Sequence, residues 1–262
     1  MRQAQESAII RLSMHIREGK DFRTFPTVSG EVRIVPSKSL FYDEDSTLLQ
    51  ASQIICGTNA ERARINNRVR QLMGRGPIPE IGDKIIGLDN HWDCISKEGN
   101  ALTNGAIGTI KSFNLKEQKF PNQTDMRFKS FPESMTLMYT DFETDDGDYF
   151  PECIMPIDYK CILTGDPTLD LKQEAILANY QKNLISQANK KDNFPLERYW
   201  KEMPYHFNYA YAITCWKAQG SQYKWVLGYD CSWLKRKDKN EYIKYLYTLC
   251  TRAEESVILV GD

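Results

Sequence analysis

The chain has 262 residues, with 34 basic and 35 acidic side chains and a hydrophobic content of 41%. It contains no apolar run near the roughly 20 residues needed to cross a bilayer, and charges interrupt its opening stretch, so we expect neither a membrane span nor a signal peptide. Seven cysteines without a CxxC pair indicate reduced, buried thiols rather than a disulfide framework or a zinc site. These features predict a cytoplasmic protein.

Charge is distributed unevenly along the chain. Residues 1–76 carry 12 basic and 8 acidic side chains, residues 77–165 carry 8 and 15, and residues 166–262 carry 14 and 12. The two basic segments can track a polyanion such as nucleic acid, whereas the acidic middle segment cannot do so by charge alone. Ordinary scatter in composition explains such differences as well, so charge by itself assigns no function.

The first segment opens with an amphipathic pattern. Ile9, Leu12 and Ile16 recur at near-helical spacing and Gly19 follows as a stop signal, which predicts a helix. Farther along, the acidic run at residues 43–45 follows no strong apolar strand. We therefore predict a solvated loop there, and no metal site.

A strand followed directly by a helix is predicted next. Residues 53–56 are a short apolar run typical of a buried strand, and Thr58 and Glu61 have the spacing of a capping box. The free N–H groups and the dipole at this helix start make Thr58 and Asn59 a candidate anion site, suited to a DNA phosphate. The alternative is that Thr58 only caps the helix. Four arginines are expected to point largely outward from it: Arg62, Arg64, Arg68 and Arg70.

From residue 77 the pattern changes to short strands separated by Gly, Asn and Asp. It predicts a small antiparallel barrel or meander, with strands at 84–88, 106–111, 135–139 and 149–154. The polar stretch 114–132 is expected to be a long hairpin loop. An apolar stripe between Leu169 and Gln187 predicts a helix after it.

The last segment returns to alternating strands and helices. We predict strands at 209–214, 225–229 and 257–260, a loop at 216–222 and a helix at 242–250. The two α/β flanks are each too short for a good sheet, so the simplest architecture is one parallel-sheet α/β domain interrupted by the β segment. The predicted boundaries are 1–76 and 204–262 for the α/β domain, 77–165 for the insert and 166–203 for a helical connector.

Two parts of the last segment carry chemical groups in a suggestive arrangement. Around Thr214, a hydroxyl, an aromatic face, an ammonium and a glycine follow one strand, which suits a phosphate backbone with a stacked base; a buried Trp216 beside a solvated Lys217 is the alternative. Arg252 lies between a helix and the last strand, where a guanidinium can bind a phosphoryl group as an arginine finger. An ordinary Arg252 paired with Glu254 or Glu255 is the alternative. Together with Thr58, these groups are expected at the carboxyl ends of strands, where open α/β sheets bind ligands.

Four stretches of the chain, in order, resemble the C-terminal half of superfamily 1 DNA helicases. The match is closest to the RecD-like group, which includes exodeoxyribonuclease V alpha subunits. Residues 207–222 (FNYAYAITCWKAQGSQ) resemble that family's motif V and residues 246–262 (LYTLCTRAEESVILVGD) its motif VI, while residues 1–4 and 54–70 are similar to motifs IV and IVa. The resemblance implies a RecA-like domain, called 2A, interrupted by an SH3-like barrel, called 2B, at 77–165.

The resemblance also implies roles for individual residues. Arg252 and Arg2 are expected to reach the γ-phosphate of ATP, and a finger of this kind is expected to be solvated and to contribute little to folding. The nucleotide is expected to lie near Gln219, Gly220 and Gln222, and single-stranded DNA along Thr58, Asn59, Thr214, Trp216 and Lys217. Trp216 stands where the family has His, so a His contact is not carried over.

No phosphate-binding Gly-x-x-x-x-Gly-Lys-Ser/Thr run occurs in the chain. ATP and Mg²⁺ are therefore expected to be bound mainly by an N-terminal RecA-like domain that precedes this segment in a longer helicase, with 5′ to 3′ translocation. We expect this chain alone to lack ATPase activity. The alternative is a stand-alone nucleic-acid-binding or interaction protein without ATPase activity; a nuclease is not supported, because clustered carboxylates that would hold two metals are missing.

Overall fold

The computed structural model describes residues 7–37, 43–119, 134–156 and 204–261, together with six isolated helical positions between 175 and 186. Most of the helix predicted at 169–187 therefore lies outside the described residues. The chain forms two compact units, Met1–Gly74 with Tyr211–Asp262, and Arg75–Ala210. Within the described part of the chain, no helix is both long and apolar enough to cross a membrane.

The first unit is built on a five-stranded sheet in which every neighbouring pair is parallel. Its order is β1-β12-β11-β2-β10, and the strands are β1 (Val32–Val35), β2 (Gln53–Cys56), β10 (Ala212–Thr214), β11 (Tyr223–Tyr229) and β12 (Ala253–Val260). All four residues of β2 are buried, as expected for an inner parallel strand whose two faces are covered. The prediction of a mixed α/β fold with a parallel sheet is confirmed.

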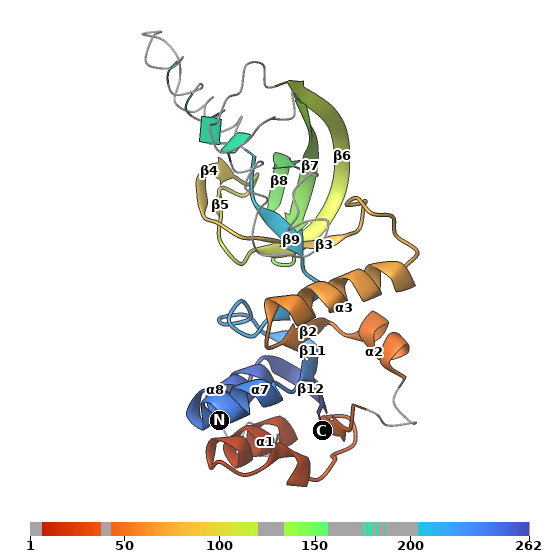
Figure 1. Ribbon diagram of the computed structural model, residues 1–262, viewed down its shortest axis with the longest axis vertical. Helices are drawn as coiled ribbons and strands as arrows, with labels where there is room; N and C mark the ends of the chain where they lie inside the picture. The colour runs from red at the N-terminus through yellow and green to blue at the C-terminus, as the bar shows by residue number, and fades with distance from the viewer. Residues whose placement is uncertain are drawn as a thin grey trace. The chain divides into compact units, whose positions relative to one another are not determined.

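Helices cover both faces of this sheet (Figure 1). One side carries α2 (Glu44–Gln50) and α3 (Asn59–Leu72), and the other carries α1 (Ala8–Arg17) and α8 (Lys239–Cys250), with the short helices η2 (Phe22–Thr24) and α7 (Ser232–Lys237) beside them. The α8 helix lies close to β11 because Gly228 has no side chain. A Cβ atom there would lie 2.3 Å from Cδ2 of Leu249.

Several predictions for this unit need correction. The acidic run 43–45 is not a loop: Asp43 caps α2, its carboxylate accepting a bond from the Ser46 N–H at 3.1 Å, and Asp45 pairs with Arg68. Arg62 and Arg70 do not point outward, since each is only 5% exposed. The sequence also gave no prediction of β1, α2 or α7 as separate elements.

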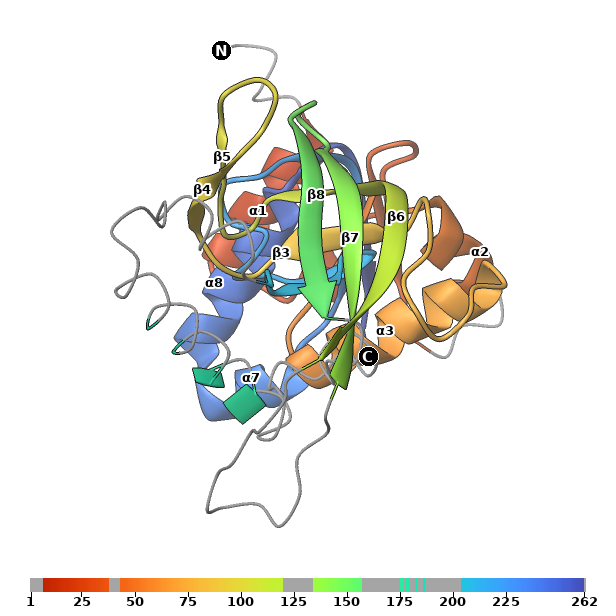
Figure 2. The same cartoon turned by 90° about the horizontal axis from the view of Figure 1, so that it is seen from above.

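The second unit holds a five-stranded antiparallel sheet in the order β8-β7-β6-β3-β9. Its strands are β3 (Lys84–Gly87), β6 (Ile107–Lys119), β7 (Ser134–Thr144), β8 (Tyr149–Pro156) and β9 (Phe207–Tyr209), and a small separate sheet pairs β4 (His91–Ile95) with β5 (Ala101–Leu102). Figure 2 shows β6, β7 and β8 as long curved strands. A register shift interrupts the β6–β7 pairing and another the β7–β8 pairing, which adds twist to such ribbons. The core includes Phe142, Phe150 and Phe207.

One strand prediction and one loop prediction fail near this sheet. The strand predicted at 209–214 is two strands in different sheets, because β9 pairs with β3 whereas β10 pairs with β2. The first part of the loop predicted at 114–132 is strand, because β6 continues to Lys119, which pairs with Ser134 at the start of β7. Its polar residues stand on an exposed ribbon that backbone hydrogen bonds hold together, so polarity alone misleads there.

Candidate functional site

The carboxyl ends of β2, β10 and β11 meet at one edge of the parallel sheet. Thr58 and Asn59 follow β2, and Thr214 ends β10 opposite Cys56 of β2. The Cys215 N–H donates to the Cys56 carbonyl at 3.0 Å, which continues the pairing beyond the strands. The structure therefore brings Thr58, Asn59 and Thr214 to a shared edge, which we call the carboxyl edge.

Thr58 caps α3 as the sequence predicts. Its Oγ1 accepts a bond from the Glu61 N–H at 3.1 Å, and the Glu61 carboxylate in turn accepts a bond from the Gly57 N–H at 3.4 Å. Burial raises the pKa of the Glu61 carboxyl. The capping interpretation of Thr58 is thus confirmed, while Asn59 is exposed at the first helical position. Phosphate binding at this turn stays a prediction.

Asn66 of α3 holds β10 in place. Its side-chain N–H donates to the Ala212 carbonyl at 3.0 Å, and its Oδ1 accepts from the Ala212 N–H at 2.8 Å. These bonds satisfy the backbone of a strand at the edge of the sheet and so position Thr214 two residues later. Asn66 is not predictable from the sequence, because a polar residue inside an amphipathic helix carries no signal of its partner.

The segment from Cys215 to Gln222 crosses the sheet from the end of β10 to the start of β11. It begins with a tight turn in which the Thr214 carbonyl accepts bonds from the N–H groups of Lys217 and Ala218. Trp216 is 53% exposed, so the alternative of a buried indole is wrong. Gly220 has a φ of +90°, which explains glycine there, and nothing lies within 4 Å of the place a Cβ would occupy.

Arg252 lies at the opposite edge of the sheet, which we call the amino edge, because it precedes β12 rather than following a strand. The expectation that it stands at a carboxyl end is therefore wrong. Its guanidinium donates to the Ser221 carbonyl at 3.1 Å, the Thr248 carbonyl at 3.3 Å and the Thr251 Oγ1 at 3.3 Å. Within the described residues it forms no ion pair, so pairing with the nearby glutamates is also wrong.

The fold thus sorts the predicted residues into two groups. Arg252 meets the loop that contains Gly220 and Gln222 at the amino edge, through Ser221. Thr58, Asn59 and Thr214 lie at the carboxyl edge, and Trp216 and Lys217 begin the loop that connects the two edges. Arg2 lies outside the described residues.

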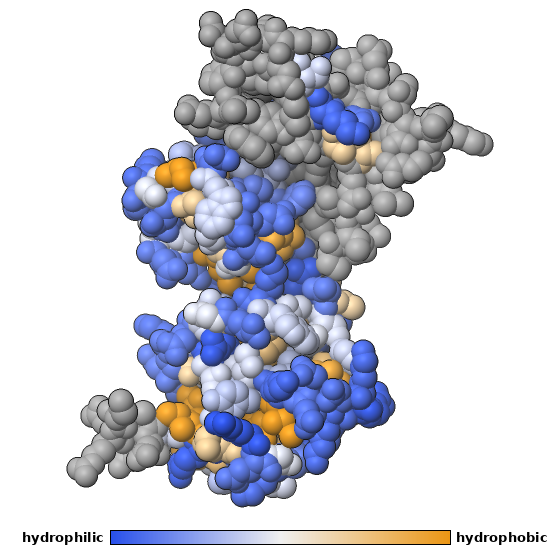
Figure 3. All heavy atoms as spheres, turned by 90° about the vertical axis from the view of Figure 1, so that its left-hand side faces the viewer, coloured by the Kyte–Doolittle hydropathy of each residue, from blue (hydrophilic) through white to orange (hydrophobic). Residues whose placement is uncertain are grey.

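A pocket of about 490 Å³ opens between this crossing loop and the helices α8 and α1. Figure 3 looks at the side of the unit that carries α8 and shows hydrophilic residues around smaller hydrophobic areas. Trp216 and Tyr245, whose ring centroids are 6.3 Å apart, line the pocket together with Gln219. The remaining lining residues are not predicted from the sequence: Arg17, Cys215, Glu241, Ile243, Lys244, Tyr247 and Thr248.

Three buried cysteines lie at strand ends near these groups: Cys56 is the last residue of β2, Cys215 follows β10 and Cys231 follows β11. Burial raises the pKa of the Cys215 thiol to about 12, although the Arg252 charge works against this, and burial raises the pKa of the Cys231 thiol to about 11. Thiols with such pKa values stay protonated near neutral pH and are poor nucleophiles. These cysteines therefore have packing roles, and among the described residues no group of His, Cys, Asp and Glu is arranged to hold a metal ion.

Residues 209–260, from the end of β9 to the end of β12, match the family profile of the UvrD-like helicase C-terminal domain. No curated protein sequence matches the chain. Similar solved structures include Pif1 from Bacteroides bound to single-stranded DNA, at 15% identity over 96% of this chain and 48% of that chain with a TM-score of 0.43. Pif1 helicase from Candida albicans is 15% identical over 99% of this chain and 54% of that chain, with a TM-score of 0.42. The chain spans about half the length of these solved structures.

Proposed function

We propose that this chain is the C-terminal half of an ATP-dependent superfamily 1 DNA helicase. One observation carries the proposal: the match to the UvrD-like helicase C-terminal domain covers the stretch in which Arg252 reaches back 31 residues to Ser221. From Tyr211 onward the matched residues form a continuous piece of the parallel-sheet unit, with its loop and its arginine in contact. In this proposal the parallel-sheet unit is domain 2A and the unit Arg75–Ala210 is domain 2B, an SH3-like barrel.

At the amino edge the chain offers a partial anion site. Arg252 supplies a permanent positive charge, Gln219 and Gln222 have exposed amides, and the space around Gly220 is open. These groups fit a phosphate chain but cannot enclose one, since the sequence has no P-loop. We assign ATP and Mg²⁺ mainly to an N-terminal RecA-like domain of the same protein, with Arg252 and Arg2 directed at the γ-phosphate. When bound, ATP would supply the β–γ phosphoanhydride bond whose hydrolysis drives translocation.

Arg252 is suited to this task because its present acceptors are neutral. Carbonyl and hydroxyl oxygens hold the guanidinium in position, and a phosphate oxygen is a stronger, charge-assisted acceptor. Because Ser221 belongs to the crossing loop, this hydrogen bond links Arg252 directly to the segment that follows Thr214. This contact offers a route from the nucleotide to the DNA path.

At the carboxyl edge we assign single-stranded DNA to Thr58, Asn59, Thr214, Trp216 and Lys217. The edge offers a helix start, an exposed indole and a cation, which are the groups that bind phosphates and stack on bases. We further assign the chain to the RecD-like group, which implies 5′ to 3′ translocation. Strand-displacement assays with 5′-tailed and 3′-tailed duplexes test this direction.

The decisive experiment measures DNA-stimulated ATP hydrolysis by the longer protein that contains this chain. We expect Arg252→Ala to reduce turnover by about 10³-fold or more, as for other arginine fingers. Arg11→Ala, at an exposed position of α1, is the matched control and should leave turnover unchanged. A protein that binds single-stranded DNA but has no ATPase activity would instead support the stand-alone nucleic-acid-binding alternative. The isolated chain should show no DNA-stimulated turnover.

A further inference from the structure

An exposed basic and aromatic group lies on and just after α7. It consists of Trp233, Arg236, Lys237 and Lys239, which we call the α7 patch. All four are exposed; Trp233 is 42% exposed, and the Lys237 Nζ stands 5.9 Å from its ring centroid. Within the described part of the chain, none of its three cations forms an ion pair with a carboxylate. No residue of the patch belongs to the DNA path assigned above.

The patch continues the carboxyl edge of the parallel sheet. It follows β11, whose neighbour β2 leads into Thr58. The two turns touch: a Cβ atom on Gly57 would lie 2.3 Å from the Cys231 Sγ, two residues before Trp233. The turn that leads into the patch therefore touches the turn that precedes Asn59.

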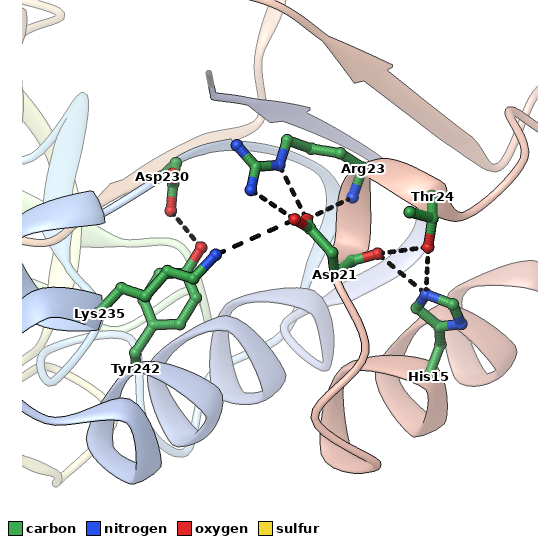
Figure 4. A network of polar contacts seen from close by, with 7 residues as sticks. All are labelled: His15, Asp21, Arg23, Thr24, Asp230, Lys235 and Tyr242. Carbon is green, nitrogen blue, oxygen red and sulfur yellow. Dashed lines mark hydrogen bonds and ion pairs between the residues drawn. The ribbon is translucent and has the colours of Figure 1, made fainter.

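A network of polar contacts fixes the base of α7 (Figure 4). The Lys235 Nζ lies 4.0 Å from the Asp21 carboxylate, which is also bound by the guanidinium of Arg23. The Tyr242 hydroxyl donates to Asp230 at 2.7 Å, just before the turn into α7. Lys235 therefore lies within ion-pair distance of Asp21, and Trp233, Arg236 and Lys237 stand on the same short helix.

The chemistry of the patch suits a single strand of nucleic acid. Neighbouring cations bind successive phosphates, and an exposed indole accepts a stacked base whatever its identity. A duplex hides its base faces, so the indole favours a single strand. An acidic protein segment would satisfy the cations but would leave the indole without a stacking partner.

We propose that the α7 patch is a second contact region for single-stranded DNA, which extends the strand path from Thr58 and Thr214 along the edge past β11. The proposal rests on the proposed function of the carboxyl edge. It adds three phosphate-binding cations and one stacking residue to that path.

The test measures binding of the 262-residue chain to a fluorescein-labelled dT15 oligonucleotide by anisotropy, over a series of salt concentrations. Arg236→Gln with Lys237→Gln should weaken binding by roughly 25-fold near 0.1 M salt and lower the salt slope by about 1.4, since each lost contact to a single strand removes about 0.7. Trp233→Ala should weaken binding by about 5-fold or more, and Trp233→Phe should retain most of it. Arg11→Gln with Lys224→Gln removes two exposed charges elsewhere and is the matched control.

The outcomes separate this inference from the proposed function. If Lys217→Gln weakens binding and the α7 patch variants match the control, the patch inference is wrong and the assigned path stands. If the chain binds no oligonucleotide at all, both are wrong. If a poly-glutamate peptide displaces the labelled dT15 as effectively as unlabelled dT15 does, the patch is a surface for acidic protein and the inference is overturned. A midpoint of thermal unfolding equal to that of wild type shows that the fold of each variant is intact.

Discussion

Replacing Arg252 separates its contribution to folding from its proposed contribution to catalysis. The resemblance alone predicts a solvated side chain on which little folding energy depends. In the structure the guanidinium is half-buried and donates to Ser221, Thr248 and Thr251. The bond to Ser221 joins the crossing loop to the chain just after α8. Arg252→Ala should therefore lower the stability of the parallel-sheet unit.

The size of the effect follows from the three bonds. A hydrogen bond contributes about 0.5 to 1.5 kcal/mol net, and water can replace part of each bond at a half-buried site. We therefore expect a loss of about 2 kcal/mol from Arg252→Ala. With a urea dependence of about 2 kcal/mol per molar, the unfolding midpoint falls by roughly 1 M. Arg252→Lys keeps the charge and one donor group but lacks the planar fork, so it should lose about half as much.

Urea unfolding of the chain, followed by far-UV circular dichroism, measures this directly, because α1, α3 and α8 all belong to the parallel-sheet unit. A midpoint unchanged by Arg252→Ala would refute the reasoning and would show a guanidinium free of its contacts in solution. In the longer protein, the ATP hydrolysis rates of wild type and variants are then compared without urea, at a temperature where each variant is fully folded. Under those conditions, an equal loss of turnover in Arg252→Lys and Arg252→Ala indicates that ATP hydrolysis needs the planar guanidinium fork. The two variants differ in their loss of stability, so stability does not explain an equal loss of turnover.

Three further outcomes are expected. Gly57→Ala places its Cβ 2.3 Å from the Cys231 Sγ and should cost about 1 to 3 kcal/mol in urea unfolding; the cost should shrink in a Cys231→Ala background, and equal costs in both backgrounds would contradict the contact. Hydrogen bonding to Arg23 lowers the pKa of Asp21 from 3.8 to about 2, so the stability that the Asp21 carboxylate provides is present above pH 4 and is lost as the pH falls toward 2. The stability difference between wild type and Asp21→Asn should therefore vanish across that interval, and a constant difference would argue against the pair. Burial raises the pKa of the Cys215 thiol to about 12, so iodoacetamide at pH 8 should alkylate Cys215 only after unfolding; mass spectrometry of native protein that shows rapid labelling would contradict this.

Local sequence signals were sufficient for the elements whose stabilising contacts lie within a few residues. The run at 53–56 and the capping pair Thr58 and Glu61 predict β2 and α3 correctly, because an apolar strand and a capped helix start are encoded in adjacent positions. Gly19, with a φ of +77°, likewise follows α1 where a stop was predicted. The stretch that matches the helicase family, residues 209–260, covers all but the first two residues of the segment that resembles motif V and all but the last two of the segment that resembles motif VI.

The arrangement of partners could not be predicted from the same signals. The stretch 209–214 is predicted as one strand, yet Tyr209 pairs with β3 and residues 212–214 pair with β2, a choice that depends on which sheet edge each part reaches. Arg70 was expected on the outer face of α3 and is 5% exposed, because helix periodicity identifies the apolar face but not how far neighbouring elements cover its sides.

The sequence by itself determined the α/β class, the capped turn at Thr58 and the helicase-like order of its segments, since each depends on residue types at short spacing. The tertiary structure decided where those segments act: parallel pairing puts Thr58 and Thr214 at one edge and Arg252 at the other, and joins Arg252 to Ser221 across 31 residues. It also placed the turn after β11, at Cys231, against Gly57. Such contacts depend on strand order and direction, which are properties of the whole sheet and of no single stretch of sequence.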